Sequence, residues 1–168
     1  MKTRIIITAI AALFVTAFTA SAQKFETFSG KTPEKVKQQY GTPVLEDAYS
    51  MSESYLLKYK DFSITFAQGS NYIEEFRTDN KKFIFLSSVL GGGVKVGDKV
   101  SKLSSIPLSK LKNKSGNKIK TPKFEVDLGD GNATKNATHV LFEEESERYY
   151  FYAENGVIKI ILFETFEN

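Results

Sequence analysis

Hydrophobic positions follow two different spacings along the chain, and these spacings predict one short helix followed by strands. Val36 and Tyr40 lie four residues apart, which is the spacing of neighbours on one face of a helix. From Phe62 to Phe66 apolar and polar residues alternate, as in a strand that buries one of its faces. The chain is therefore expected to pack a short amphipathic helix on a sheet.

The ends of this helix are marked by residues with strong positional preferences. Thr32 is a favourable N-cap, and Pro33 suits the first helical position, where its missing N–H costs nothing. Gly41 favours the turn that ends a helix, and Pro43 prevents its continuation. The predicted helix covers 33–40. A helix this short is marginal alone in water, so it must dock on another element.

Segments with a period of two occur in both halves of the chain and are separated by residues typical of turns. The mostly polar segment 45–54 is expected to be a loop. Asn155-Gly156, between two apolar segments, is the clearest hairpin signal. The predicted strands are 55–59, 62–67, 72–78, 82–87, 124–128, 139–143, 148–153 and 157–163.

A weaker copy of the helical motif opens the second half. Asp98 is expected to cap it, with Val100 and Leu103 facing inward and Pro107 ending it. The spacing from Val100 to Pro107 repeats the spacing in the first motif, which favours an internal repeat over a coincidence of amphipathic patterns. The three glycines at 91–93 are the expected junction. The predicted organisation is a signal peptide at 1–22 and two helix-plus-sheet units at 23–90 and 91–168.

The first unit carries the pattern Gly30-x-Thr32-x-x-x-Val36-x-x-x-Tyr40-Gly41-x-Pro43. This pattern resembles the opening motif of the β-lactamase-inhibitory-protein-like superfamily, which includes the SmpA/OmlA outer-membrane lipoproteins. The second unit, with Gly93-Val-Lys-Val-Gly-Asp98 before its helix, resembles a variant found in secreted proteins of Bacteroides-type bacteria. The likeness covers the helical segments well and the strands only as a pattern.

The resemblance implies an α+β fold, in which a short helical segment packs on a four-stranded antiparallel sheet and the whole unit is duplicated in tandem. In the tandem inhibitors the sheets form a concave surface that grips a partner protein. In the lipoproteins the module takes part in envelope assembly. The chain has Lys31 where the motif usually has Met, and it has no lipid-attachment Cys, which argues against the lipid-anchored role.

The first 22 residues have the pattern of a secretory signal peptide. Lys2 and Arg4 precede an uncharged, mostly apolar segment at 5–18, and Ala20-Ser21-Ala22 is a small-x-small cleavage signal. The apolar segment is short for a membrane anchor, which is the alternative interpretation. The mature protein is thus expected to begin at Gln23, to be periplasmic or secreted, and to contain no transmembrane segment.

Composition narrows the class of protein further. The chain has no cysteine, so an exported fold must rely on a hydrophobic core and not on disulfides. Without the expected signal peptide, 21 basic and 20 acidic residues remain, so the net charge falls from +3 to +1. Arg occurs only three times in the whole chain. These features argue against nucleic acid as a partner.

Candidate catalytic chemistry is sparse. His139 is the only histidine and lies inside a predicted strand, with no nucleophile or carboxylate that the sequence pairs with it. The sequence has no nucleophile-elbow pattern, no phosphate-binding loop and no zinc-spaced ligand set. The acidic segment 127–132 departs from calcium-loop spacing and is interpreted as a tight turn. We therefore expect no metal, no cofactor and no enzymatic activity.

The aromatic strand Tyr149-Tyr-Phe-Tyr152 is the strongest candidate for recognition. Alternation places Tyr150 and Tyr152 on one face, where they could bind a partner, with His139 as a further rim residue. The alternative is an aromatic core on both faces of the sheet.

The leading hypothesis is an exported, non-enzymatic binding or scaffold module that contacts a protein or cell-envelope component through a sheet face. The second is a carrier of small apolar ligands with a pocket between helix and sheet. The third is an enzyme built on scattered carboxylates.

Overall fold

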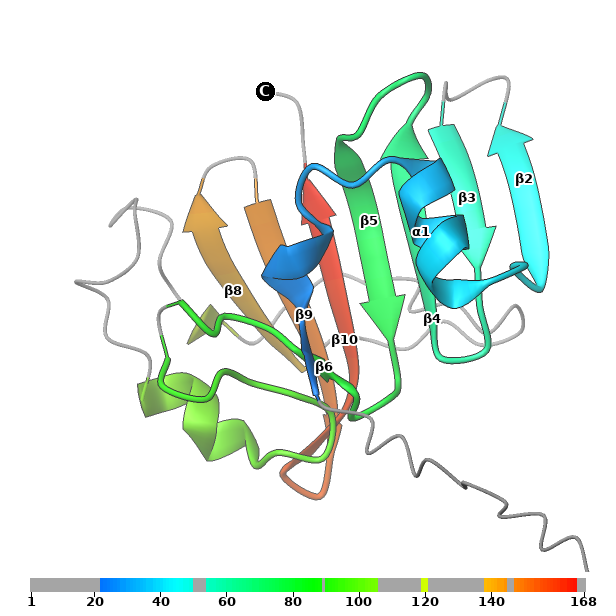
Figure 1. The fold of residues 1–168 in the computed structure, drawn as a ribbon. Coiled ribbons are helices and arrows are strands. Elements are labelled where there is room, and N and C mark those ends of the chain that lie inside the picture. Colours follow the sequence, from blue (N-terminus) through cyan, green and yellow to red (C-terminus); the bar gives the residue numbers. More distant parts are fainter. Residues whose placement is uncertain are drawn as a thin grey trace, which may run out of the picture.

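One antiparallel sheet dominates the computed structural model, which describes residues 22–49, 54–88, 90–105, 119–120, 138–144 and 147–165. The sheet has eight strands in the order β2-β3-β4-β5-β10-β9-β8-β7 (Figure 1). The strands are β2 (Leu45–Tyr49), β3 (Ser54–Lys58), β4 (Phe62–Ala67), β5 (Ile73–Thr78), β7 (Ile119–Lys120), β8 (His139–Glu144), β9 (Glu147–Glu154) and β10 (Val157–Thr165).

The strand order divides the sheet into two meanders. Strands β2 to β5 are neighbours in chain order, and so are β7 to β10. The last strand of each meander joins the two, because β5 pairs antiparallel with β10 and places Phe76 opposite Phe163. A sheet-rich fold with a few short helices is compatible with the expected α+β class, and the strands of both halves form one continuous sheet.

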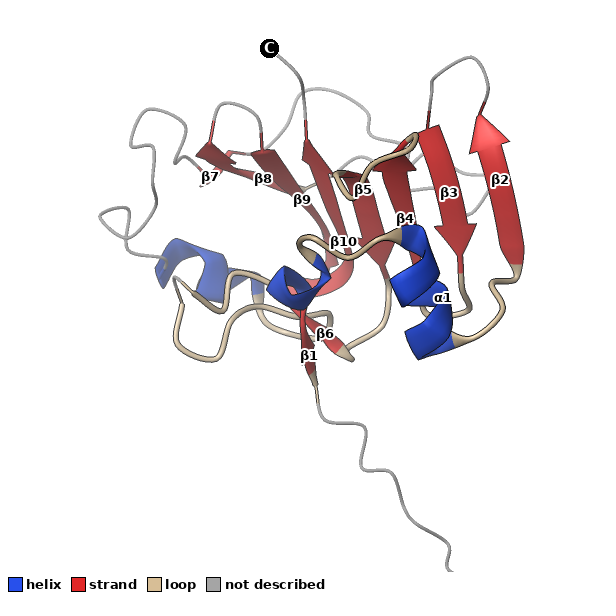
Figure 2. Cartoon of the chain, turned by 45° about the horizontal axis from the view of Figure 1, so that its top comes forward, coloured by secondary structure: helices blue, strands red, loops and turns tan. Residues whose placement is uncertain are grey.

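The helices of the described residues cover a single face of this sheet (Figure 2). They are α1 (Pro33–Tyr40) and two 3-10 helices, η1 (Phe25–Phe28) and η2 (Val100–Ser105). Each contributes buried side chains to one hydrophobic cluster with the strands: Phe25 and Phe28 from η1, Val36 from α1 and Leu103 from η2. A small parallel sheet, β1 (Gln23–Lys24) with β6 (Phe83–Ile84), lies beside η1.

Aromatic rings fill the centre of this cluster. The ring of Phe25 lies 5.0 Å from that of Phe76 and 4.8 Å from that of Phe163, measured between centroids, so it contacts both meanders. In β4 the buried residues are Phe62, Ile64 and Phe66, which confirms the predicted alternation. Burying each such side chain contributes about 2 kcal/mol.

The predicted ends of the first helix are confirmed. The side chain of Thr32 accepts a hydrogen bond from the backbone N–H of Lys35 at 3.4 Å, and Pro33 is the first helical residue. Gly41 ends the helix with a φ of 81°, in the region that favours glycine. Val36 is fully buried, and it holds this short helix on the sheet.

The prediction of a loop at 45–54 is wrong for its first half. Residues Leu45–Tyr49 form β2, which pairs antiparallel with β3 from Leu45 opposite Lys58 to Tyr49 opposite Ser54. This strand lies at the edge of the sheet and is largely exposed, with Leu45 46% accessible. An edge strand with little burial needs no hydrophobic alternation, so the sequence pattern did not reveal it.

The segment around 82–87 also differs from its prediction. It does not extend the main sheet, because β6 pairs with β1 and Phe85 forms an isolated bridge with Val94. That bridge spans the glycine-rich junction. Gly93 has a φ of 59° and is buried against the chain, so that a Cβ there would lie 2.5 Å from the carbonyl oxygen of Phe85.

The second helical motif forms a 3-10 helix, which is wound more tightly than the α-helix of the first motif. Residues Val100–Ser105 are a 3-10 helix with Leu103 buried and Val100 packed against the core. The Asp98 carboxylate accepts from the backbone N–H of Lys95 and from the Lys102 ammonium, so it closes the preceding turn. The segments 106–118 and 121–137, which contain Pro107, the predicted strand 124–128 and the acidic turn, lie outside the described residues.

The Asn155-Gly156 hairpin is confirmed between β9 and β10. Asn155 has a φ of 50° and Gly156 a φ of 74°, as the tight hairpin turn with two positive φ angles requires.

Within the described part of the chain, no helix has the length and apolar character needed to cross a bilayer.

Candidate functional site

The sheet face opposite the helices is the first candidate surface. Strand β9 alternates as predicted: Tyr149 and Phe151 belong to the core under the helices, while Tyr150 and Tyr152 point to the other side. The two predicted binding tyrosines therefore share a face.

Their surroundings differ. Tyr150 is only 3% exposed and packs in a second buried cluster with Val140, Ile160 and Leu162. Tyr152 is half-buried at the side of that cluster, and its hydroxyl donates a hydrogen bond to Glu154 at 2.6 Å. The expectation that Tyr150 lines an open surface is not met, because its ring is enclosed. The alternative of an aromatic core on both faces describes Tyr150 well.

His139 lies on the opposite face from the two tyrosines. It is paired with Phe151 across β8 and β9, so its side chain belongs to the side that carries the helices. Its Nδ1 is 3.0 Å from the hydroxyl oxygen of Thr138, and burial lowers the pKa of the ring below its ordinary value. The structure thus does not bring the three predicted site residues together.

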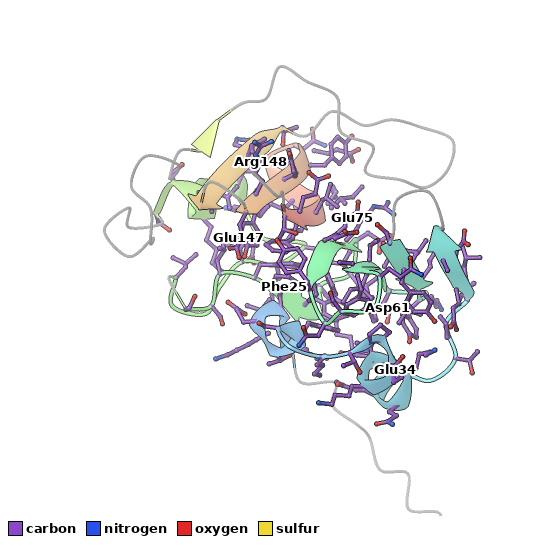
Figure 3. The ribbon with its side chains drawn as sticks, turned by 90° about the horizontal axis from the view of Figure 1, so that it is seen from above. Phe25, Glu34, Asp61, Glu75, Glu147 and Arg148 are labelled. Carbon is purple, nitrogen blue, oxygen red and sulfur yellow. The ribbon has the colours of Figure 1, made fainter. Side chains whose placement is uncertain are left out.

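Charged residues that the sequence reasoning did not single out lie next to Tyr150. Glu164 is opposite Arg148 on one side and opposite Glu75 on the other. Arg148 and Glu75 are labelled in Figure 3. Burial raises the pKa of Glu164, and a hydrogen bond with Tyr150 and the nearby Arg148 charge partly offset that effect. The alternation that placed Tyr150 would also have placed Arg148 and Glu164, so the same pattern could have found them.

The neighbouring part of this face is polar and accessible. Because Phe62, Ile64 and Phe66 of β4 face the core, Ser63 and Thr65 face away from it. Ser63 is paired with Arg77 of β5, and Thr65 with Glu75. All four of these side chains are half-buried, and they form a polar surface beside the buried Tyr150 cluster.

A cavity of about 330 Å³ on the helical side is the second candidate site. It lies between η1 and the neighbouring ends of β5, β9 and β10. Two of its lining residues, Phe25 and Glu147, are labelled in Figure 3. The described lining residues are Phe25, Glu26, Ser29, Gly30, Asn71, Tyr72, Ile73, Leu86, Ser88, Glu147, Tyr149, Phe163 and Thr165.

The apolar wall of this cavity is aromatic. The rings of Tyr149 and Phe163 are 5.0 Å apart, and Phe25 lies against both at 6.5 and 4.8 Å. Tyr72 completes the wall and is 43% exposed, which makes it one of the most accessible large hydrophobic residues described. The aromatic wall is therefore buried at Phe25, Tyr149 and Phe163 and accessible at its rim, where Tyr72 lies.

Glu26 provides an acidic group in the same wall. Its Oε1 accepts hydrogen bonds from the backbone N–H of Ser87 at 2.7 Å and from the Ser87 hydroxyl at 3.2 Å. Its Oε2 is buried and has no hydrogen-bond partner among the described residues. The two Ser87 bonds hold Oε1 of the carboxylate in place, and Oε2 is left without a donor among the described residues.

Among the residues that the structure describes, no three His, Cys, Asp or Glu side chains form a group that could hold a metal ion. Comparison of the chain with protein-family models, with curated proteins and with solved structures finds no match in any of the three.

Proposed function

We propose that this protein is an exported, non-enzymatic binding or scaffold module that contacts a protein or cell-envelope component through the helix-free face of its sheet. The observation that carries the proposal is the one-sided arrangement of the described helices, which all pack on the same face. The polar surface formed by Ser63, Thr65, Glu75 and Arg77 is the accessible part of the other face. Charged and polar groups of both signs suit a specific contact with a macromolecule.

We further propose that the chain is a tandem of two related units, 23–90 and 91–168, of the β-lactamase-inhibitory-protein-like type. The order of the strands supports this proposal, since each half supplies one meander and the last strands of the two halves pair antiparallel. The helical residues that correspond in the repeat, Val36 and Val100, both pack on the core, Val36 fully buried and Val100 half-buried. In such a tandem the continuous sheet would present one extended recognition surface.

Site-specific cross-linking tests the sheet-face contact. A photoreactive amino acid at Ser63 places the probe on the helix-free face, and the same amino acid at Gln38, an exposed position of α1, is the matched control. Expressed in the producing cell, the Ser63 probe should give one discrete cross-linked envelope product that the Gln38 probe lacks. Equal products from both positions, or none from Ser63, would contradict the proposal.

Export is tested on the protein itself. We expect cleavage before Gln23 and a periplasmic or extracellular mature protein, with no nucleic acid or cofactor bound. N-terminal sequencing and mass measurement of the protein from fractionated cells check this expectation. A cytoplasmic protein that retains Met1 would exclude it.

The cavity under η1 favours a second candidate function, which is transport or storage of a small ligand between helix and sheet. Its volume of about 330 Å³ lies in the range of small-molecule sites. Native mass spectrometry of the protein from its own cell should then reveal a bound small molecule that denaturation releases.

A further inference from the structure

We propose that the cavity under η1 binds a small organic cation, and that the carboxylate of Glu26 receives the ligand's ammonium group. The inference rests on the second candidate function and specifies its ligand class. Three independent features of the cavity support it: an unsatisfied carboxylate oxygen, the sign of the charge in the lining, and the aromatic wall.

The first feature is the hydrogen-bonding state of Glu26. Its Oε1 is saturated by the N–H and the hydroxyl of Ser87, whereas Oε2 is buried and lacks a hydrogen-bond partner among the described residues. A buried acceptor without a donor is costly, and most buried polar atoms in proteins are hydrogen-bonded. A ligand N–H placed in the cavity would supply the missing donor.

The second feature is charge. The described lining residues include two carboxylates, Glu26 and Glu147, and no Lys, Arg or His. A concave site lined by charge of one sign concentrates ligands of the opposite sign. The cavity therefore favours a cation over a neutral ligand of the same shape, and it disfavours anions such as fatty acids or phosphates.

The third feature is the wall formed by Phe25, Tyr149, Phe163 and Tyr72. The face of an aromatic ring attracts an ammonium group, and its area also packs against the apolar part of a ligand. A cavity of about 330 Å³ admits a compact molecule with one amine and one ring or short chain. The inferred class is thus a primary amine with an apolar body.

Isothermal titration calorimetry with two probes tests the inference. The cation is 2-phenylethylammonium, and the neutral probe of nearly the same shape is 2-phenylethanol. We expect the cation to bind the purified protein at least about tenfold more tightly than the alcohol, because a charge-assisted hydrogen bond contributes more than a neutral one. Binding of the cation should weaken as salt is added.

Substitutions test whether Glu26 is responsible for the preference for the cation. Glu26→Gln retains a carbonyl oxygen for Ser87 and removes the charge, so cation affinity should fall about tenfold while alcohol affinity stays unchanged. Asp79→Asn removes one charge at the opposite end of β5 from the cavity and should leave both affinities unchanged. Tyr72→Ala changes an accessible rim residue and should weaken both probes without altering the thermal midpoint.

Equal binding of the cation and the alcohol would overturn the inference, whereas the proposed carrier function would still stand. Undiminished cation binding by Glu26→Gln, with the folded state verified by circular dichroism, would also overturn it. If neither probe binds, the inference fails. The carrier function is then decided by native mass spectrometry, and the sheet-face proposal is unaffected.

Discussion

At the scale of single residues, Tyr150 and Tyr152 show how much two positions on the same face of one strand can differ. Both point away from the helices, but Tyr150 is enclosed by Val140, Ile160 and Leu162, and Tyr152 is half-buried beside them. Tyr150 also forms a hydrogen bond with Glu164. Tyr150 is therefore a packing residue in this structure, and Tyr152 is the accessible one.

Replacing each tyrosine with alanine should separate the two roles. Tyr150→Ala removes a buried ring and should lower the free energy of unfolding by about 3 kcal/mol. Tyr152→Ala removes a partly exposed ring and should cost less than about 1 kcal/mol. Urea denaturation followed by circular dichroism measures both. Similar losses in the two variants would show that the two rings are equally enclosed.

His139 gives a pH dependence of stability with a defined sign. Burial lowers its pKa in the folded state below the ordinary value of 6.5, so the unfolded chain binds the proton more readily. Its contribution to stability is therefore complete above pH 6.5 and is lost as the pH falls through the folded-state pKa.

The matched variant for this prediction is His139→Gln, which cannot titrate. Between pH 7 and pH 5 the wild type should lose more free energy of unfolding than His139→Gln, as measured by urea denaturation at each pH. Parallel pH profiles for the two proteins would contradict the prediction.

At the scale of elements, the junction between the halves is a packed turn. Phe85 and Val94 exchange hydrogen bonds across it, at 2.8 Å in each direction. Gly93 fits below this bridge because it has no side chain. The three consecutive glycines at 91–93 are therefore expected to contribute unequally to stability, although the sequence presents them as equivalent.

Two alanine substitutions within this glycine run should show that difference. Gly93→Ala places a Cβ 2.3 Å from Cγ2 of Ile84 in a positive-φ conformation, and should cost at least about 2 kcal/mol. Gly91→Ala meets nothing within 4 Å and should be close to neutral. Thermal unfolding compares them, and equal midpoints would mean that the turn is not packed as described.

At the scale of the whole molecule, the two predicted units share one core. Phe25 of the first unit contacts Tyr149 and Phe163 of the second, and β5 pairs with β10 through the middle of the sheet. Each unit separated from the other would expose an apolar sheet edge and half of an aromatic cluster. Any duplication in this chain has therefore produced a single folding unit.

Separate expression of the two halves tests this cooperation. Residues 23–90 and 91–168 alone should lack the cooperative thermal transition of the whole protein. When the two halves are mixed in denaturant and refolded together, they should recover the near-ultraviolet circular dichroism of the whole protein. The reason is that the β5–β10 pairing and the shared core can re-form. A cooperative transition in either isolated half would show that the half folds independently.

Local sequence patterns determined the elements that a few residues define. Thr32, Pro33 and Gly41 set the ends of α1, and Asn155-Gly156 set the last hairpin, because caps and tight turns depend on the conformations of the residues within them. The alternation in β4 and β9 likewise assigned side chains to faces correctly. These local features do not depend on what the elements pack against.

Tertiary structure alone decided how these elements meet. The edge strand β2 has no burial pattern, and a register shift in β10 sends Ile158 and Ile160 to opposite faces despite their spacing of two. The enclosure of Tyr150, the separation of His139 from the tyrosines and the cavity at Glu26 all depend on segments far apart in the chain. Alternation gives the direction of a side chain, whereas burial depends on what lies opposite it, which only the folded chain specifies.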